Sequence, residues 1–130
     1  MNSLSRELFQ RELITIKESD DSMIEKKERV IKTYINLFKK DISTLKEYLE
    51  TESKLIEAAL VMSKNEVESI STELNNFYSI KENNSFSYLI EDEIERREER
   101  VNFEKRKVEN YSKILKLYKF VCLVLMETAA

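Results

Sequence analysis

The absence of glycine and proline is the feature that most constrains what this chain can fold into. Glycine adopts positive φ freely and proline pre-sets φ, so tight turns, sheet bulges and phosphate-binding loops depend on these two residues. At average usage a chain of 130 residues would contain roughly nine glycines and six or seven prolines. The composition therefore excludes a turn-rich β fold. It predicts an all-α fold in which elongated, long helices form a coiled coil or a helical hairpin, with no sheet of consequence.

Charge and histidine content narrow the possible functions. The 22 basic and 25 acidic residues nearly balance, at a formal net charge of −3, so we expect no nucleic acid partner and no general attraction to anionic lipid. The chain contains no histidine, which is the usual general base and the commonest zinc ligand. We therefore expect a protein that is not an enzyme and that binds no metal, cofactor or small molecule.

The single cysteine, Cys122, lies among apolar residues and has no second cysteine with which to form a disulfide. Such a cysteine usually packs as a small buried hydrophobe, and unpaired cysteine is typical of a reducing compartment. The sequence thus predicts a buried Cys122 and an intracellular location, cytoplasmic or nuclear. The first residues lack the apolar core of a secretory signal. The longest apolar run, Phe120 to Met126, is far shorter than the roughly 20 residues that span a bilayer.

The first segment of the chain reads as a short amphipathic helix. Large apolar residues recur at helical spacing between Leu4 and Ile16, which predicts a helix within residues 1–18. Its basic residues could meet lipid headgroups, but interspersed glutamates oppose that. We expect residues 4–18 to dock against a partner or a neighbouring helix rather than against a membrane.

Two longer helices are expected after this segment. Ser22 followed by Glu25 fits a capping box and predicts the start of a long coiled-coil helix over residues 22–77. A stretch rich in asparagine and serine then predicts a bend or loop over 78–87. A second coiled-coil helix with an apolar end is expected over 88–128.

The apolar residues of both long helices form seams that need a packing partner. From Ile31 to Leu49 the steps alternate between four and three residues, which is the heptad pattern of a coiled coil. Glu52 then occupies an expected apolar slot, and successive steps of four indicate a stutter. The residues predicted to form a partner interface are Ile31, Ile35, Phe38, Ile42, Leu45, Leu49, Ile56, Val108, Tyr111, Leu115, Tyr118, Cys122, Leu123 and Leu125.

The segment from Ile114 to Met126 is apolar over more than one helical face, so a single seam cannot cover it. Residues 120–126 could form either a helix or a short strand, because the β-branched Val121 and Val124 permit both. In either form we expect the segment to be buried against another polypeptide.

Charged clusters in the second half of the chain are interpreted as solvated helix faces. The acidic residues between Glu91 and Glu99 alternate with arginines, which is typical of a salt-bridged helix rather than a cation site. The basic run 105–107 lies between Glu104 and Glu109, as on the flank of a coiled coil. We expect no nucleic-acid-binding patch there.

The stretch Val108 to Lys119, with the sequence Val-Glu-Asn-Tyr-Ser-Lys-Ile-Leu-Lys-Leu-Tyr-Lys, is a charged coil that leads into an apolar segment. It resembles the point at which the small coiled-coil subunits of the outer-kinetochore microtubule-attachment complex pass from rod to globular head. The resemblance implies a rod-forming subunit of a hetero-oligomeric complex. The chain departs from that family in having almost nothing after the apolar segment, where the family carries its globular domain.

These features predict a non-catalytic coiled-coil scaffolding subunit of a hetero-oligomeric assembly, and the resemblance implies an assembly of the kinetochore type. Its expected partners are other coiled-coil chains, in a hetero-oligomer rather than a homo-oligomer. The alternative is a stand-alone antiparallel helical hairpin that acts as a stalk or adaptor, of the kind found in secretion systems and rotary motors.

Overall fold

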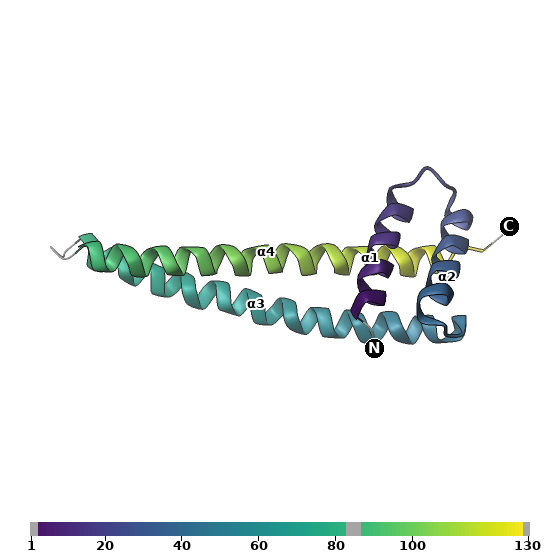
Figure 1. Ribbon diagram of the computed structural model, residues 1–130, viewed down its shortest axis with the longest axis horizontal. Coiled ribbons are helices and arrows are strands. Elements are labelled where there is room, and N and C mark those ends of the chain that lie inside the picture. Colours follow the sequence, from purple (N-terminus) through teal and green to yellow (C-terminus); the bar gives the residue numbers. More distant parts are fainter. Residues whose placement is uncertain (1–2, 83–86, 129–130) are drawn as a thin grey trace. The chain divides into compact units, whose positions relative to one another are not determined.

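The computed structural model describes residues 3–82 and 87–128, and every regular element in these ranges is a helix (Figure 1). The elements are α1 (Ser3–Glu18), α2 (Met23–Phe38), the 3₁₀ helix η1 (Ile42–Thr44), α3 (Leu45–Glu82) and α4 (Ser87–Leu125). The predicted all-α fold is confirmed, with no strand among the described residues.

The chain divides into two compact units. The terminal unit consists of the described residues up to Ile56 together with those from Lys113 onward. It contains α1, α2, η1, the first turns of α3 and the last turns of α4. The hairpin unit runs from Glu57 to Ser112 and contains the rest of α3 and α4.

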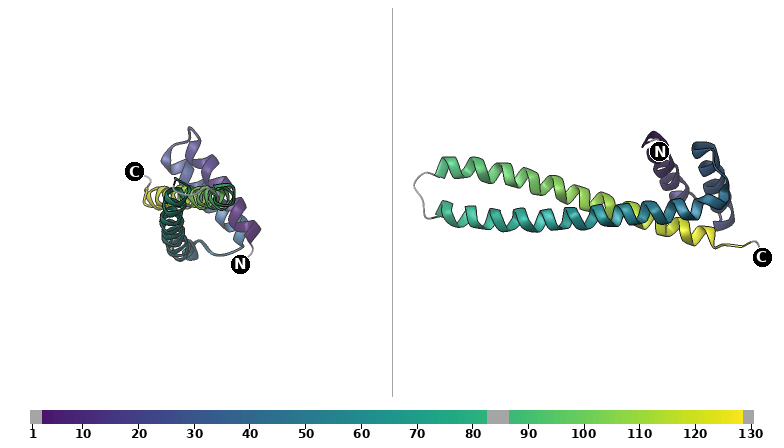
Figure 2. Two further views of the ribbon diagram at one scale, coloured as in Figure 1. Left: turned by 90° about the vertical axis from the view of Figure 1, so that its left-hand side faces the viewer. Right: turned by 90° about the horizontal axis from the view of Figure 1, so that it is seen from below.

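The hairpin unit is an antiparallel pair of helices (Figure 2). Ion pairs join Lys81 to Glu91 at 3.1 Å and Arg100 to Glu66 at 2.8 Å, so residue numbers fall along α3 as they rise along α4. Apolar side chains from both helices pack together along the same stretch of the hairpin, namely Ile70, Leu74, Phe77, Ile90, Ile94 and Val101. The chain therefore forms an in-chain hairpin, one of the two arrangements that the sequence predicts.

The bend predicted over 78–87 is wrong for residues 78–82, which form the last turn of α3. Contacts from α4 hold this turn, because Tyr78 Oη donates to Glu98 Oε1 at 2.6 Å and Lys81 pairs with an α4 glutamate. Ser87 already belongs to α4. The remaining positions of the predicted bend, 83–86, lie outside the described residues.

The terminal unit has a core built around an aromatic cluster, with α1 as the predicted amphipathic helix. The rings of Phe9, Tyr34, Phe38 and Tyr48 all contact one another, with centroid separations from 4.8 to 5.9 Å. Aliphatic side chains from α1, α2, α3 and α4 are also buried in the unit, including Leu13, Ile16, Val30, Leu45, Leu49, Leu117, Val121 and Val124.

The single helix predicted over 22–77 is wrong, because the chain breaks between α2 and α3. The predicted cap at Ser22 is present, with its Oγ accepting from Glu25 N at 3.2 Å. At the other end, Lys39 takes the left-handed conformation, φ 55° and ψ 36°, and Asp41 caps η1. In an unbroken helix Tyr34 and Tyr48 would lie about 21 Å apart, so the break is what brings their rings together.

The end of α4 differs from two expectations. Residues 120–125 are helical, so the strand alternative is wrong, and the helix ends at Leu125 rather than at 128. Val121 and Val124 are fully buried at helical spacing, whereas Cys122, predicted to be buried, is exposed. The buried face of α4 is therefore centred one residue away from the predicted stripe through Cys122, because Val121 and Val124 fill the core.

Candidate functional site

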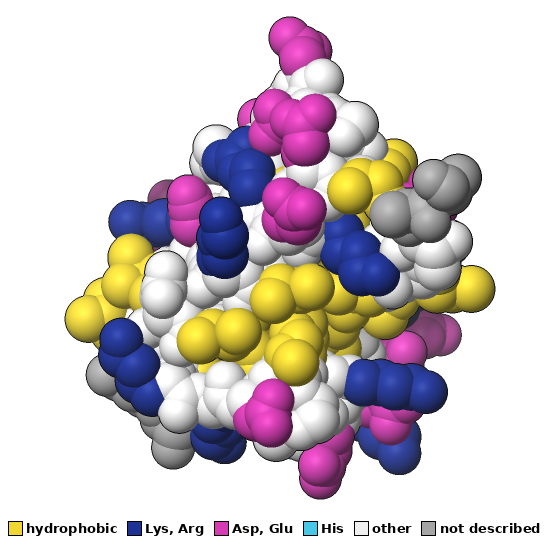
Figure 3. Space-filling view, turned by 90° about the vertical axis from the view of Figure 1, so that its right-hand side faces the viewer, with side chains coloured by type: hydrophobic (Ala, Val, Ile, Leu, Met, Phe, Trp, Pro, Cys, Tyr) yellow, Lys and Arg dark blue, Asp and Glu magenta, His cyan; other side chains and the backbone are white. Residues whose placement is uncertain are grey.

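An apolar surface remains uncovered along α2 and η1. It consists of Ile24, Ile31, Ile35 and Ile42, which we name the isoleucine surface. The first three lie on one side of α2 by helical spacing. Ile35 is 40% and Ile42 is 37% exposed, while Ile24 and Ile31 are half-buried. Figure 3 views the terminal unit from the side of α2 and shows hydrophobic side chains gathered among charged ones.

The isoleucine surface exists because the apolar arc of α2 is wider than the core needs. Val30 and Tyr34 face the core and are fully buried. Ile31 and Ile35 each follow one of these residues and are turned by about 100° around the helix. The seam predicted through Ile31 and Ile35 therefore does not face the chain's own core.

Basic side chains accompany the isoleucine surface. Lys32, Lys39 and Lys40 are exposed, and none of them forms an ion pair within the described residues. Asp41, the adjacent acidic residue, accepts from Ser43 N with its carboxylate. From Glu25 to Asp41 the segment holds six basic and three acidic residues, a net +3 in a chain of net −3. The segment is positive even though Arg29 is paired with Asp21 outside it, which neutralises one of its charges.

The other members of the predicted interface have several environments. Leu45, Leu49, Ile56 and Tyr118 are buried in the chain's own fold, whereas Phe38, Val108, Tyr111, Leu115 and Leu125 are partly buried. Val108 and Tyr111 belong to the hairpin unit and the others to the terminal unit. Cys122 and Leu123 are exposed, together with Ile35 and Ile42. The structure thus does not bring the predicted residues together as one surface.

An ion pair between the buried Glu52 and the partly exposed Arg6 explains the charged residue in the apolar seam. Glu52 is only 3% exposed, and Arg6 Nε of α1 donates to its Oε1 at 2.7 Å. This hydrogen bond raises the pKa of Arg6. The sequence marks Glu52 as anomalous but gives no signal for Arg6, because the pairing crosses from α1 to α3.

Two tyrosine hydroxyls lie in the same part of the terminal unit. Gln10 Nε2 donates to Tyr118 Oη at 3.0 Å, while the buried Tyr48 Oη lies near Glu52 and Tyr118 without a hydrogen bond of good geometry among the described residues. Burial raises the pKa of both tyrosines above its ordinary value. Both hydroxyls therefore stay protonated at neutral pH, and neither is poised as a base.

A cleft of about 240 Å³ opens beside the side chains of Arg6, Tyr48 and Glu52. Its lining includes Arg6, Tyr34, Lys40, Thr44, Tyr48 and Glu52. The one deeply buried carboxylate, Glu52, is held by Arg6, so the cleft contains a structural ion pair rather than a free general base. The cleft offers no chemistry that we can assign to a reaction.

Three comparisons with known proteins assign no family to the chain. No protein-family model matches it, and comparisons with curated proteins and with solved structures gave no match. Among the described residues, no three His, Cys, Asp or Glu side chains are grouped so as to hold a metal ion. No described helix combines the length and apolar character needed to cross a membrane. The isoleucine surface is a feature on which a functional proposal can be built.

Proposed function

We propose that this chain is a non-catalytic scaffolding subunit of a hetero-oligomeric assembly. Its in-chain hairpin serves as a spacer, and its terminal unit docks another protein chain through the isoleucine surface. The observation that carries the proposal is the exposure of Ile35 and Ile42 beside a core already completed by Val30 and Tyr34. Burying large apolar side chains stabilises an interface by roughly 1.5–3 kcal/mol each, so such a surface favours a partner.

The hairpin unit supports the spacer part of the proposal. Its seam from Ile70 to Val101 and its ion pairs close α3 against α4 within one chain. The exposed, unpaired Cys122 supports an intracellular location as part of the same proposal. Because residues 108–119 resemble outer-kinetochore coiled-coil subunits, an assembly of that kind is the first in which we would look for the partner.

Dilution tests whether the chain folds by itself. We expect the helical circular dichroism signal and the melting temperature to be the same at low and high micromolar concentration, because the hairpin is closed in-chain. Sedimentation under the same conditions reports the oligomeric state. Loss of helix on dilution would contradict the spacer role. It would indicate instead that the chain is a coiled-coil subunit that folds only with a partner.

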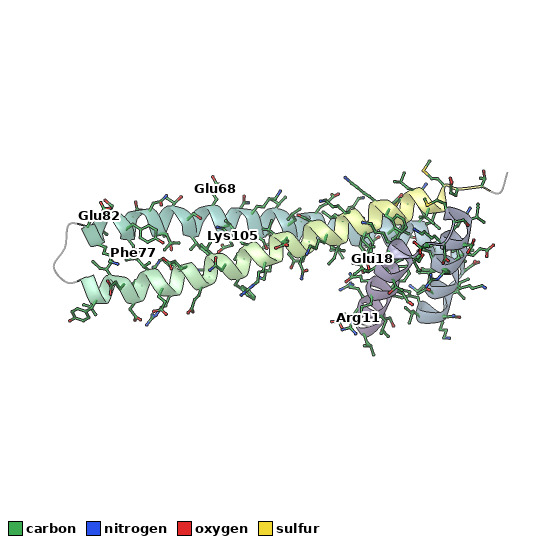
Figure 4. All side chains as sticks on the ribbon, turned by 90° about the horizontal axis from the view of Figure 1, so that it is seen from above. Arg11, Glu18, Glu68, Phe77, Glu82 and Lys105 are labelled. Atoms are coloured by element: carbon green, nitrogen blue, oxygen red, sulfur yellow. The ribbon has the colours of Figure 1, made fainter. Side chains whose placement is uncertain are left out.

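Site-specific photo-crosslinking in cells tests the docking surface. A photoreactive amino acid replaces Ile35 in one variant and Glu68 in a matched control, since Glu68 is exposed and points away from α4 (Figure 4). We expect one dominant protein adduct from position 35 and none from position 68. Equal labelling at both positions, or no adduct at position 35, would contradict docking through the isoleucine surface.

A further inference from the structure

We infer that the segment docking on the isoleucine surface is an amphipathic helix whose apolar stripe is flanked by acidic residues. This inference rests on the proposed docking function and adds the chemistry of the partner. Ile24, Ile31 and Ile35 supply anchors separated by seven and four residues along α2, and a partner helix reads such a surface with its own i, i+3, i+4 and i+7 positions.

The charges beside the surface select the partner. Lys32 follows Ile31, and Lys39 and Lys40 lie between Ile35 and Ile42. All three lysines are exposed, Lys40 also lines the cleft that contains Glu47 and Glu52, and the carboxylate of Asp41 is engaged in capping η1. An acidic flank would be attracted to this end of the surface, whereas a basic flank would be repelled.

The same charges disfavour two other occupants. A second copy paired with its α2 parallel would bring Lys32, Lys39 and Lys40 toward an identical set, and like charges facing each other across an interface oppose association. An anionic membrane would meet Glu28, which is exposed on the same side of α2 as Ile24 and Ile31. A partner helix with acidic flanks complements the charges of the three lysines. A single basic residue on that helix can pair with Glu28.

Two synthetic peptides probe the inference directly. Both are three-heptad helices with leucine at the a and d positions, and they differ only in carrying glutamate or lysine at e and g. We expect the glutamate peptide to bind the full chain at least about 10-fold more tightly at low salt, with the ratio falling as salt screens the charges. Fluorescence anisotropy of labelled peptide measures both affinities.

Charge reversal supplies the decisive variants. The triple variant Lys32→Glu, Lys39→Glu and Lys40→Glu should invert the preference between the peptides. A control with the same change in net charge reverses three exposed lysines of α4, Lys105, Lys116 and Lys119, and should keep the preference for the glutamate peptide. Ile35→Asp should weaken both peptides, and circular dichroism verifies that each variant remains folded.

Each remaining outcome overturns the acidic-helix inference. Equal binding of the two peptides, or binding of neither, would exclude an acidic partner, while a crosslink from position 35 would still support docking. Self-association that Ile35→Asp abolishes would identify a second copy as the occupant. Binding to phosphatidylserine vesicles, lost in the triple variant of α2 and its linker, would identify a membrane instead.

Discussion

Two tyrosines of the aromatic cluster differ in what their hydroxyls contact. Tyr34 Oη lies 2.6 Å from Thr44 Oγ1 in a hydrogen bond, whereas Tyr48 Oη is buried near Glu52 and Tyr118 but makes no hydrogen bond of good geometry among the described residues. We expect Tyr34→Phe to lower the free energy of unfolding by about 1 kcal/mol, and Tyr48→Phe to leave it unchanged or raise it by up to about 1 kcal/mol. Urea denaturation at neutral pH measures both. A loss of stability in Tyr48→Phe as large as that in Tyr34→Phe would show that Tyr48 Oη is hydrogen-bonded after all.

The buried tyrosines also predict a loss of stability in alkali. Burial raises the pKa of Tyr48 and Tyr118 in the folded state, so the unfolded chain loses these protons first, near its ordinary pKa of about 10. Their contribution to stability is complete below that pH and falls by up to about 1.4 kcal/mol per pH unit per tyrosine above it. We expect Tyr48→Phe to flatten this fall in urea titrations between about pH 9 and pH 11. The exposed control Tyr88→Phe should follow the parent chain, and a parent whose stability did not fall would contradict the burial of these hydroxyls.

Lys39 holds the one positive φ angle among the described residues, at 55°. The left-handed conformation costs a residue with a Cβ roughly 1–2 kcal/mol, and glycine avoids this cost but has more freedom to lose from the unfolded state. We expect Lys39→Gly to raise the free energy of unfolding by about 1 kcal/mol. Lys40→Gly, at a position without positive φ, should lower it. Destabilisation by Lys39→Gly in urea denaturation would argue that the break after α2 is not capped in this way.

At the level of the helices, the contributions of apolar packing and of ion pairs to stability can be measured separately in the hairpin unit. Ile70 is almost fully buried in the seam, while Arg100 pairs with Glu66 on the exposed face. We expect Ile70→Ala to cost about 2–4 kcal/mol, and Arg100→Ala to cost no more than about 0.5 kcal/mol because exposed pairs are screened and ordered at an entropic cost. Hydrogen exchange of hairpin amides checks both. A larger loss of protection in Arg100→Ala would mean that the charges, rather than the seam, hold the helices together.

Helix starts were easier to predict than helix breaks, for a physical reason. Ser22 and Glu25 place a hydroxyl and a carboxylate at capping distance, which marks a helix start before any tertiary contact forms. Asp41 provides a similar cap for η1. The apolar steps of four and three continue across it, however, and no glycine marks the left-handed residue before it. The break between α2 and α3 is stabilised by packing of the aromatic cluster, which joins residues far apart in sequence.

The candidate site could be predicted only in part. Ile31, Ile35 and Ile42 follow from the seam pattern, but the pattern cannot say which part of a wide apolar arc the core will use. Val30 and Tyr34 fill the core because the ring of Tyr34 belongs to the aromatic cluster. The isoleucines are left outside as a consequence, a result that depends on contacts with α1 and α3.

For the whole molecule, the composition determines the length of the helices, whereas the distribution of charge along the chain determines which surface can attract a partner. A chain without glycine or proline makes long helices, and α3 and α4 accordingly have 38 and 39 residues. Its net charge of −3 hides the positive segment from Glu25 to Asp41. The net charge of the whole chain therefore does not reveal this positive segment. A docking partner interacts with the charges near its binding surface rather than with the net charge of the chain.

The end of α4 offers a way to separate folding from assembly. Val121 is fully buried, whereas Leu123 is 63% exposed on the same helix. Val121→Asp places an unpaired charge in the core and should cost the free chain at least about 3 kcal/mol. Leu123→Asp should change the free energy of unfolding by no more than about 0.5 kcal/mol. Urea denaturation gives both values.

The crosslink from position 35 then reports whether Leu123 also takes part in assembly. If the partner covers the end of α4, Leu123→Asp should remove the adduct while the chain remains fully folded, because an aspartate would be desolvated in the interface. An adduct that persists would confine the docking surface to α2 and η1. Equal destabilisation of the free chain by Leu123→Asp and Val121→Asp would contradict the orientation of α4, since the two residues would then share one buried environment.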